Sequence, residues 1–247
     1  MRKLLAYPLT ILYFIVFGIT LLIFHPIQWF CLRVFGYQAH KKSVDILNWF
    51  LMRCLNILGT RFTFNNPHQI PTDSPCIIVS NHQSMYDIPP IIWYMRKHHG
   101  KFISKKELGS GIPSISFNLK YGGGALIDRK NPEQAISAIR KLGKYAEENT
   151  RSVVIFPEGT RSRDGHPKKF KTAGLKVLIE EMPSALIVPI SINNSWKTLQ
   201  YGKFPMGIGA HIKYQVHEPF AVKDLTVGEV LQKVESDIVG GIVKTPL

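Results

Sequence analysis

Residues 76–87 read CIIVSNHQSMYD, and residues 152–162 read SVVIFPEGTRS. In both segments an apolar run of strand length passes directly into a stretch rich in hydrogen-bonding side chains. A short continuous apolar run is typical of a strand buried on both faces, as in a parallel sheet covered by helices. Because loops at strand ends carry functional residues in such sheets, the two polar stretches are the first candidates for a functional site.

The chain after residue 59 alternates short apolar runs with helical stretches. Asn131-Pro132-Glu133 is a strong helix start, because it supplies an N-cap, a proline at the first helical position and a carboxylate near the positive end of the helix dipole. Alternating strands and helices predict an α/β fold in which a mainly parallel sheet is flanked by helices. The predicted strands are Cys76–Ser80, Lys101–Ile103, Ala125–Ile127, Ser152–Phe156 and Ala185–Ile190, and the predicted helices lie near Met85–His98, Pro132–Glu148, Thr172–Glu181 and Val227–Val239.

The first 59 residues differ in character from the rest. No Lys, Arg, Asp or Glu occurs from Leu4 to Leu32, and a helix over Leu4–Phe24 would be about 30 Å long, which matches the hydrocarbon core of a bilayer. His25-Pro26 predicts a break directly after this helix. We therefore predict membrane-associated helices in residues 1–59 and an α/β domain in residues 60–247. Whether the first helix crosses the bilayer or re-enters one leaflet stays open.

Val44–Leu58 predicts a second N-terminal helix of mixed character. At about 100° per residue its polar side chains fall within an arc of roughly 140°, with apolar side chains elsewhere. Such a helix either packs on the core of a globular domain or lies in a membrane interface, and the apolar run before it favours the interface. The polar side chains of this helix are Asp45, Asn48, Arg53 and Asn56.

The chain of 247 residues is strongly basic, with 31 Lys and Arg against 17 Asp and Glu and a net charge of +14. A basic surface attracts polyanions such as nucleic acid, an anionic leaflet or an acidic carrier protein. No DNA-reading motif or platform of basic and aromatic residues accompanies the charge, which argues against nucleic acid. The 3 cysteines are too far apart in the sequence to suggest a metal-binding pair or a disulfide framework. This pattern is typical of proteins in a reducing compartment.

His82 and Asp87 form a candidate acid–base pair. An imidazole takes up a proton near neutral pH, and a carboxylate can fix its tautomer and stabilise its charged form. The spacing alone is weak evidence, because it recurs at His40 and at His68, neither of which follows a predicted strand; we expect both on the solvated surface. Positions five apart are about 140° apart around a helix, so His82 and Asp87 can meet only if the chain between them forms a turn.

Taken together, the two polar stretches resemble a known family. Residues 81–87 (NHQSMYD) are similar to the first motif of the glycerolipid acyltransferases, and residues 156–162 (FPEGTRS) match another of their motifs without a mismatch. Residues 105–108, with Pro113 and residues 127–129, are similar to the second motif, and residues 188–190 to the fourth. The order is that of the family, and the resemblance is strongest to the bacterial members that acylate lysophosphatidate.

The resemblance implies transfer of an acyl group from a thioester, on coenzyme A or acyl carrier protein, to the sn-2 hydroxyl of 1-acyl-sn-glycerol 3-phosphate, giving phosphatidate. His82 would be the general base and Asp87 its orienting carboxylate, with no metal and no cofactor besides the thioester co-substrate. There are two alternatives. The acceptor is another lysophospholipid or glycerol 3-phosphate, or the chain is a non-catalytic lipid-binding protein of the same fold. By resemblance, the acceptor-binding residues are Glu158, Gly159, Thr160, Arg161, Arg129 and Lys105.

The expected location follows from the two substrates. The acceptor and product are lipids, whereas the thioester arrives from the cytoplasm. We therefore expect an acyltransferase domain in residues 60–247 on the cytoplasmic face of the inner membrane, anchored by the helices of residues 1–59.

Overall fold

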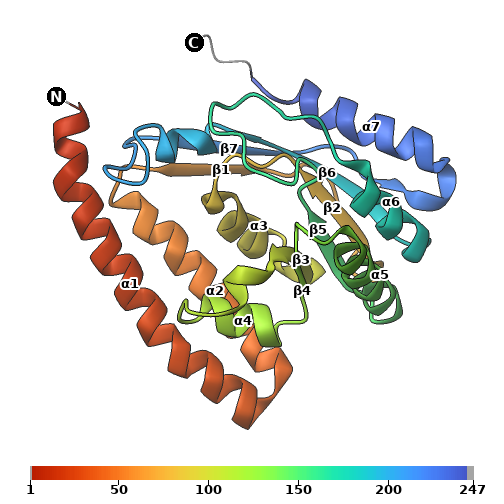
Figure 1. Cartoon of the computed structure of the whole chain (residues 1–247), viewed down its shortest axis with the longest axis horizontal. Coiled ribbons are helices and arrows are strands. Elements are labelled where there is room, and N and C mark those ends of the chain that lie inside the picture. The colour runs from red at the N-terminus through yellow and green to blue at the C-terminus, as the bar shows by residue number, and fades with distance from the viewer. Residues whose placement is uncertain (1, 244–247) are drawn as a thin grey trace.

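A twisted sheet forms the centre of the structure, a computed structural model that describes residues 2–243. Its strands run in the order β1-β7-β6-β2-β5-β3-β4, and β8 pairs with β6. β7 and β8 are antiparallel to β6, whereas the other pairs are parallel. The predicted mainly parallel sheet flanked by helices is confirmed (Figure 1). The strands are β1 (Arg61–Asn65), β2 (Cys76–Ser80), β3 (Gly100–Lys105), β4 (Ala125–Ile127), β5 (Ser152–Ile155), β6 (Leu186–Asn193), β7 (His211–Val216) and β8 (Phe220–Ala221).

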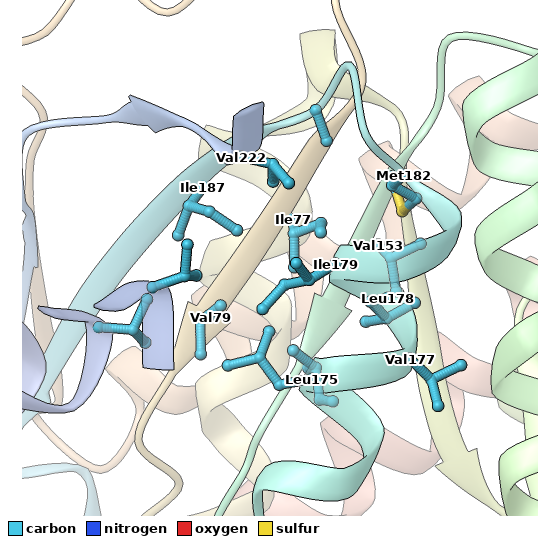
Figure 2. Close-up of a cluster of buried hydrophobic side chains, with 14 of the residues drawn as sticks. Ile77, Val79, Val153, Leu175, Val177, Leu178, Ile179, Met182, Ile187 and Val222 are labelled. Atoms are coloured by element: carbon cyan, nitrogen blue, oxygen red, sulfur yellow. The ribbon is translucent and has the colours of Figure 1, made fainter. Parts of the chain in front are cut away.

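One face of the sheet carries the larger hydrophobic core (Figure 2). Ile77, Val153 and Ile187 project from three neighbouring strands and pack against Leu175 and Leu178 of a covering helix. Side chains on this face are almost fully removed from water, which contributes about 25 cal/mol per Å² of buried apolar surface. The helices on this face are α5 (Pro132–Glu148), α6 (Thr172–Glu181) and α7 (Val227–Gly240).

The opposite face carries a second core and the N-terminal helices (Figure 1). Ile78 and Val154 project to this side and pack with Ile91 and Met95. The first two helices form a hairpin that runs down and back beside this face, shown in red and orange in Figure 1. The helices here are α1 (Arg2–Phe35), α2 (Tyr37–Asn56), α3 (Ile88–Tyr94) and α4 (Ile115–Tyr121).

The first helix is longer than the sequence predicted. α1 continues through Pro26 to Phe35, so the predicted break at His25-Pro26 is wrong. A proline removes one hydrogen bond from a helix, yet the helix persists where packing holds the turns on either side. Ser114 holds the turn before Pro26, because its N–H donates to His25 Nδ1 at 3.0 Å and its hydroxyl donates to Leu21 O at 2.6 Å.

The outer side of α1 is apolar and open to solvent. Among residues 2–243, α1 is the one helix long and apolar enough to cross a membrane, and little of it is buried in the protein. A continuous apolar surface of this kind is a membrane or protein contact site. Its exposed side chains include Leu5, Ile15, Ile19, Leu22, Ile23 and Phe30.

The polar side chains of α2 divide between the two sides of the helix. Asp45 and Asn48 are buried, whereas Arg53 is exposed. His40 is also fully buried, against the ring of Phe117 in α4 at 5.6 Å, so the prediction of a solvated His40 is wrong. The reason is the hairpin, which presses the first turns of α2 onto α4. Burial lowers the pKa of His40 below its ordinary value.

Candidate active site

His82 and Asp87 meet in a turn, as their spacing required. β2 ends at Ser80, and after an extended stretch residues 85–87 form a single 3-10 turn. His82 Nδ1 lies 2.8 Å from Asp87 Oδ2, which also accepts the N–H of Gln83 at 2.7 Å and of Ser84 at 2.8 Å. Because a carboxylate only accepts hydrogen bonds, the hydrogen of the neutral imidazole lies on Nδ1, and Nε2 keeps a lone pair that can take up a proton.

The surroundings fix the His82 ring and leave its second nitrogen free. The ring stacks on Phe156, with centroids 4.2 Å apart and planes 20° apart. Asp87 is completely buried, whereas His82 remains 9% exposed. Nε2 of His82 has no hydrogen-bond partner among residues 2–243. The pair therefore combines a rigid, buried carboxylate with an accessible base.

The second polar stretch holds the main chain of His82 on both sides. The N–H of His82 donates to Glu158 Oε1 at 2.8 Å, and the N–H of Ser162 donates to His82 O at 2.7 Å. Glu158 Oε2 accepts the N–H of Lys168 at 3.0 Å. Burial raises the pKa of Glu158, although these N–H groups act in the opposite direction. Both oxygens of Glu158 are thus used to join two loops.

The remaining residues of this stretch lie on the outer side of the same loop. Gly159 has a φ of +67°, a left-handed conformation that favours glycine. Thr160 Oγ1 accepts a hydrogen bond from Lys168 Nζ at 3.1 Å. Arg161 is exposed, and it lines a cavity near the turn. Of the predicted acceptor-binding residues, Arg161 is the one that lines that cavity.

Lys105 and Arg129 lie farther along the same edge of the sheet. Lys105 ends β3 and is paired in register with Ile127 of β4, two residues before Arg129. Both side chains are exposed, and Lys105 forms an ion pair with Glu107 at 2.9 Å. Neither residue lines the cavity. The structure therefore brings these two cations close to each other but not into the wall around Arg161.

The cavity beside the turn has a volume of about 400 Å³. It begins at Tyr86 and Arg161 and reaches Lys101, at the opposite end of the parallel strands. That path covers about five strand residues, or roughly 15 Å. The sequence did not predict this cavity, because its walls come from segments far apart in the chain. Its apolar lining includes Leu51, Ile78, Ile91, Met95, Phe102 and Val154.

The far end of the cavity is polar. Lys101 Nζ donates to Gly122 O at 2.6 Å and also to the hydroxyl of Tyr37, which lies 3.0 Å from His99 Nε2. Burial lowers the pKa of Lys101 to about 7, and the charge of Arg151 acts in the same direction. Burial likewise lowers the pKa of His99 to about 4. No motif in the sequence pointed to these residues as part of a cavity.

The side chains at the site have the chemistry to move a proton and to bind an anion. Among residues 2–243, no three or more His, Cys, Asp or Glu side chains are grouped so that they could hold a metal ion. A free imidazole nitrogen backed by a carboxylate can deprotonate a hydroxyl. His82 itself does not line the cavity, but Tyr86 of the same turn and Arg161 do, and a guanidinium there can bind an anionic, hydrocarbon-bearing molecule.

The fold has a close counterpart among solved structures. The crystal structure of the 1-acyl-sn-glycerophosphate (LPA) acyltransferase, PlsC, from Thermotoga maritima aligns with a TM-score of 0.78 over 98% of this chain and 96% of that chain, at 24% sequence identity. The likeness extends to the N-terminal hairpin, since nearly the whole of both chains is covered.

Comparison of sequences places the chain among acyltransferases. It is 26% identical to human 1-acyl-sn-glycerol-3-phosphate acyltransferase beta over 79% of this chain and 68% of the human protein. It is 28% identical to 1-acyl-sn-glycerol-3-phosphate acyltransferase BAT2, chloroplastic, of Brassica napus over 66% of this chain and 46% of that protein, so the chain spans less than half of the plant relative. A family model described as Acyltransferase matches residues 61–193, more than half of the 247 residues. The chain therefore belongs to the Acyltransferase family.

Proposed function

We propose that this chain transfers an acyl group from a thioester to the sn-2 hydroxyl of 1-acyl-sn-glycerol 3-phosphate and releases phosphatidate. The observation that carries the proposal is the hydrogen bond of His82 Nδ1 to Asp87, which leaves Nε2 free, in a turn whose residue Tyr86 lines an apolar cavity together with Arg161. The curated relatives compared above are 1-acyl-sn-glycerol-3-phosphate acyltransferases, which supports the choice of acceptor.

His82 is the general base of the proposed reaction. Its Nε2 accepts the proton of the acceptor hydroxyl while the hydroxyl oxygen bonds to the thioester carbonyl carbon. Asp87 stabilises the resulting imidazolium through Nδ1, at 2.8 Å. The C–S bond then breaks, and the imidazolium returns its proton to the leaving thiolate. The acyl group passes directly from sulfur to oxygen, and no protein group is acylated.

The cavity suits a hydrocarbon chain. Its lining is mostly apolar over a depth of roughly 15 Å, and tetrahedral C–C bonds of about 1.5 Å advance about 1.25 Å per carbon. An extended chain of about a dozen carbons would therefore fill it. Burial of such a chain contributes about 0.8 kcal/mol per methylene group, which favours long-chain thioesters on coenzyme A or acyl carrier protein.

Arg161 is the proposed partner of the acceptor phosphate. A guanidinium binds phosphate through paired hydrogen bonds, and Lys203, also in the cavity wall, adds a second positive charge. The chain carries a net charge of +14, which favours an anionic membrane surface and an acidic or phosphorylated donor.

The arrangement of α1 favours attachment to one leaflet over a crossing helix. α1 is hydrogen-bonded to the catalytic part of the protein at Thr10 and again at Leu21 and His25, over a length of about 22 Å. A crossing helix would carry these loops into the hydrocarbon core, where their backbone groups would lack partners. We propose that α1 lies in the interface of the cytoplasmic leaflet with its apolar side in the acyl region.

A matrix of acyl donors against acceptors tests the proposal. Purified wild-type protein is mixed with acyl-CoA or acyl-ACP and with lysophosphatidate, other lysophospholipids or glycerol 3-phosphate, and the products are identified by mass. We expect phosphatidate from lysophosphatidate, and a loss of at least about a hundredfold in kcat for His82→Ala with folding unchanged. A preference for another acceptor would replace the proposed substrate, and transfer by none would indicate a lipid-binding protein.

A further inference from the structure

The buried side of α1 contacts the rest of the protein partly through hydroxyl groups. The outer side of the helix is apolar, yet its buried side includes Thr10 and Tyr13. The Thr10 hydroxyl accepts the N–H of Met206 at 3.0 Å and donates to Ala6 O at 2.6 Å. A helix that served as an anchor alone would need only apolar packing on this side, so the polar contacts call for a separate explanation.

Tyr13 bonds directly to the turn that carries Asp87. Its side chain is fully buried, and its hydroxyl donates to the hydroxyl of Tyr86 at 3.0 Å, with the two rings edge to face at 6.1 Å. Tyr86 in turn donates to the sulfur of Met206 at 3.6 Å, the residue whose N–H donates to Thr10. The contacts thus form a closed path from α1 to the turn and back to α1.

The other side of the same turn is held by the sheet. The hydroxyl of Tyr214, on β7, lies within hydrogen-bond distance of Tyr86 O at 3.4 Å and of Asp87 O at 3.3 Å. The turn is therefore fixed between one tyrosine from the sheet and one from α1. Asp87 Oδ2 accepts three hydrogen bonds from residues 82–84, so a displacement of the neighbouring Tyr86 alters the geometry of all three.

We propose that Tyr13 is a positioning residue for acyl transfer, acting through Tyr86 to hold Asp87 and therefore His82 in their reactive geometry. The proposal rests on the proposed function, because it treats His82 as the base. Tyr13 is not among the residues that line the cavity, and its effect is confined to the placement of the turn. The helix that carries the apolar outer surface thereby also contributes to the geometry of the base.

Tyr13→Phe tests the inference, because it keeps the ring and removes only the hydroxyl. We expect kcat to fall about fivefold, or about 1 kcal/mol, as for one lost hydrogen bond, with KM for donor and acceptor unchanged. Tyr7→Phe is the matched control: Tyr7 is exposed on the same helix and its hydroxyl has no hydrogen bond to residues 2–243. This control should keep the wild-type kcat.

A double-mutant cycle with Tyr86→Phe shows whether Tyr13 acts through Tyr86. We expect Tyr86→Phe to lower kcat, and Tyr13→Phe to have no further effect in that background. Equal effects of Tyr13→Phe in both backgrounds, an unchanged kcat, or a change confined to KM would each overturn the inference. If Tyr13→Phe does not fold, Tyr86→Phe tests the same bond, and a wild-type kcat overturns it.

The same experiment separates this inference from the proposed function. Rates are compared at equal concentrations of folded protein, well below the unfolding temperature, so that a loss of stability alone does not change kcat. A wild-type protein without transfer activity would contradict the proposed function, whereas an active wild type with an equally active Tyr13→Phe variant contradicts only the role of Tyr13.

Discussion

The main-chain N–H of His82 donates to the side chain of Glu158 across 2.8 Å, although the two residues are 76 positions apart in the chain. Asp87 orients the imidazole of His82, and Glu158 fixes the backbone from which that imidazole projects. The two sequence motifs are thus one structural unit. A residue predicted by resemblance to contact the acceptor has both of its oxygens engaged by main-chain N–H groups, at His82 and at Lys168.

Glu158→Gln should therefore destabilise the protein more than a surface substitution does. A glutamine offers only one oxygen, so its amide N–H₂ would face one of the two main-chain donors. We expect the free energy of unfolding to fall by about 1–3 kcal/mol, the cost of leaving a buried donor unpaired, and kcat to fall with it. Glu148→Gln, at an exposed position on α5, is the control. Equal denaturation midpoints for the two variants would contradict this role of Glu158.

The parts of the fold that could be predicted from the sequence are those formed by local pattern. β4 and the helices α5 and α6 begin and end at the predicted residues, because apolar runs and helix-starting residues mark them locally. β1 and β7 were missed. The side chains of β1 alternate between exposed and half-buried positions, and every second side chain of β7 is buried. Both strands are polar enough to be taken for loops, so only their pairing with each other identifies them as strands.

The candidate site divides in the same way. The contact of His82 with Asp87 followed from a turn after a buried strand, which five residues are enough to specify. The stacking of His82 on Phe156 and the polar end of the cavity depend on how distant segments pack. His40 shows the limit of local inference, because two lysines follow it in the sequence and yet the hairpin buries it.

Arg161→Ala should raise KM for the acceptor while changing kcat little. A charge-assisted hydrogen bond contributes about 1.5–3 kcal/mol, so its loss predicts a rise in KM of about 10- to 100-fold. The comparison acceptor is 1-monoacylglycerol, which has the same hydroxyl and no phosphate, and on it the variant should match wild type. Arg163→Ala is the control, since Arg163 is exposed nearby but does not line the cavity. Similar KM values for both variants would exclude Arg161 as the phosphate ligand.

Charges on the outer side of α1 should release the protein from membranes. Ile19 and Ile23 are more than half exposed, and each contributes about 2 kcal/mol if its side chain is buried in lipid. We expect Ile19→Glu with Ile23→Glu to weaken binding to anionic vesicles more than tenfold in a sedimentation assay, with activity on short-chain, micellar acceptor retained. Val239→Glu places one such charge on α7, on the opposite side of the molecule (Figure 1), and should bind as wild type does. Equal binding by all three proteins would show that α1 is not the membrane contact.

Lys101→Met should stabilise the protein near neutral pH, and this gain in free energy of unfolding over the wild type should disappear at alkaline pH. Burial lowers the pKa of Lys101 from 10.5 to about 7, so between these values the unfolded chain binds a proton that the folded chain does not. As pH rises from 7 to 10, the free energy of unfolding of the wild type therefore increases by roughly 3 kcal/mol relative to that of the variant. Below pH 7 Lys101 is protonated in both the folded and the unfolded chain, so the difference in free energy of unfolding between wild type and variant is constant. Thermal unfolding of both proteins at several pH values measures this difference. His99 and Arg151 are present in both proteins, so their own charges cancel in the comparison. Lys141→Met, exposed on α5, should show no such dependence. A gap between wild type and Lys101→Met that does not change with pH would mean that Lys101 remains charged in the fold.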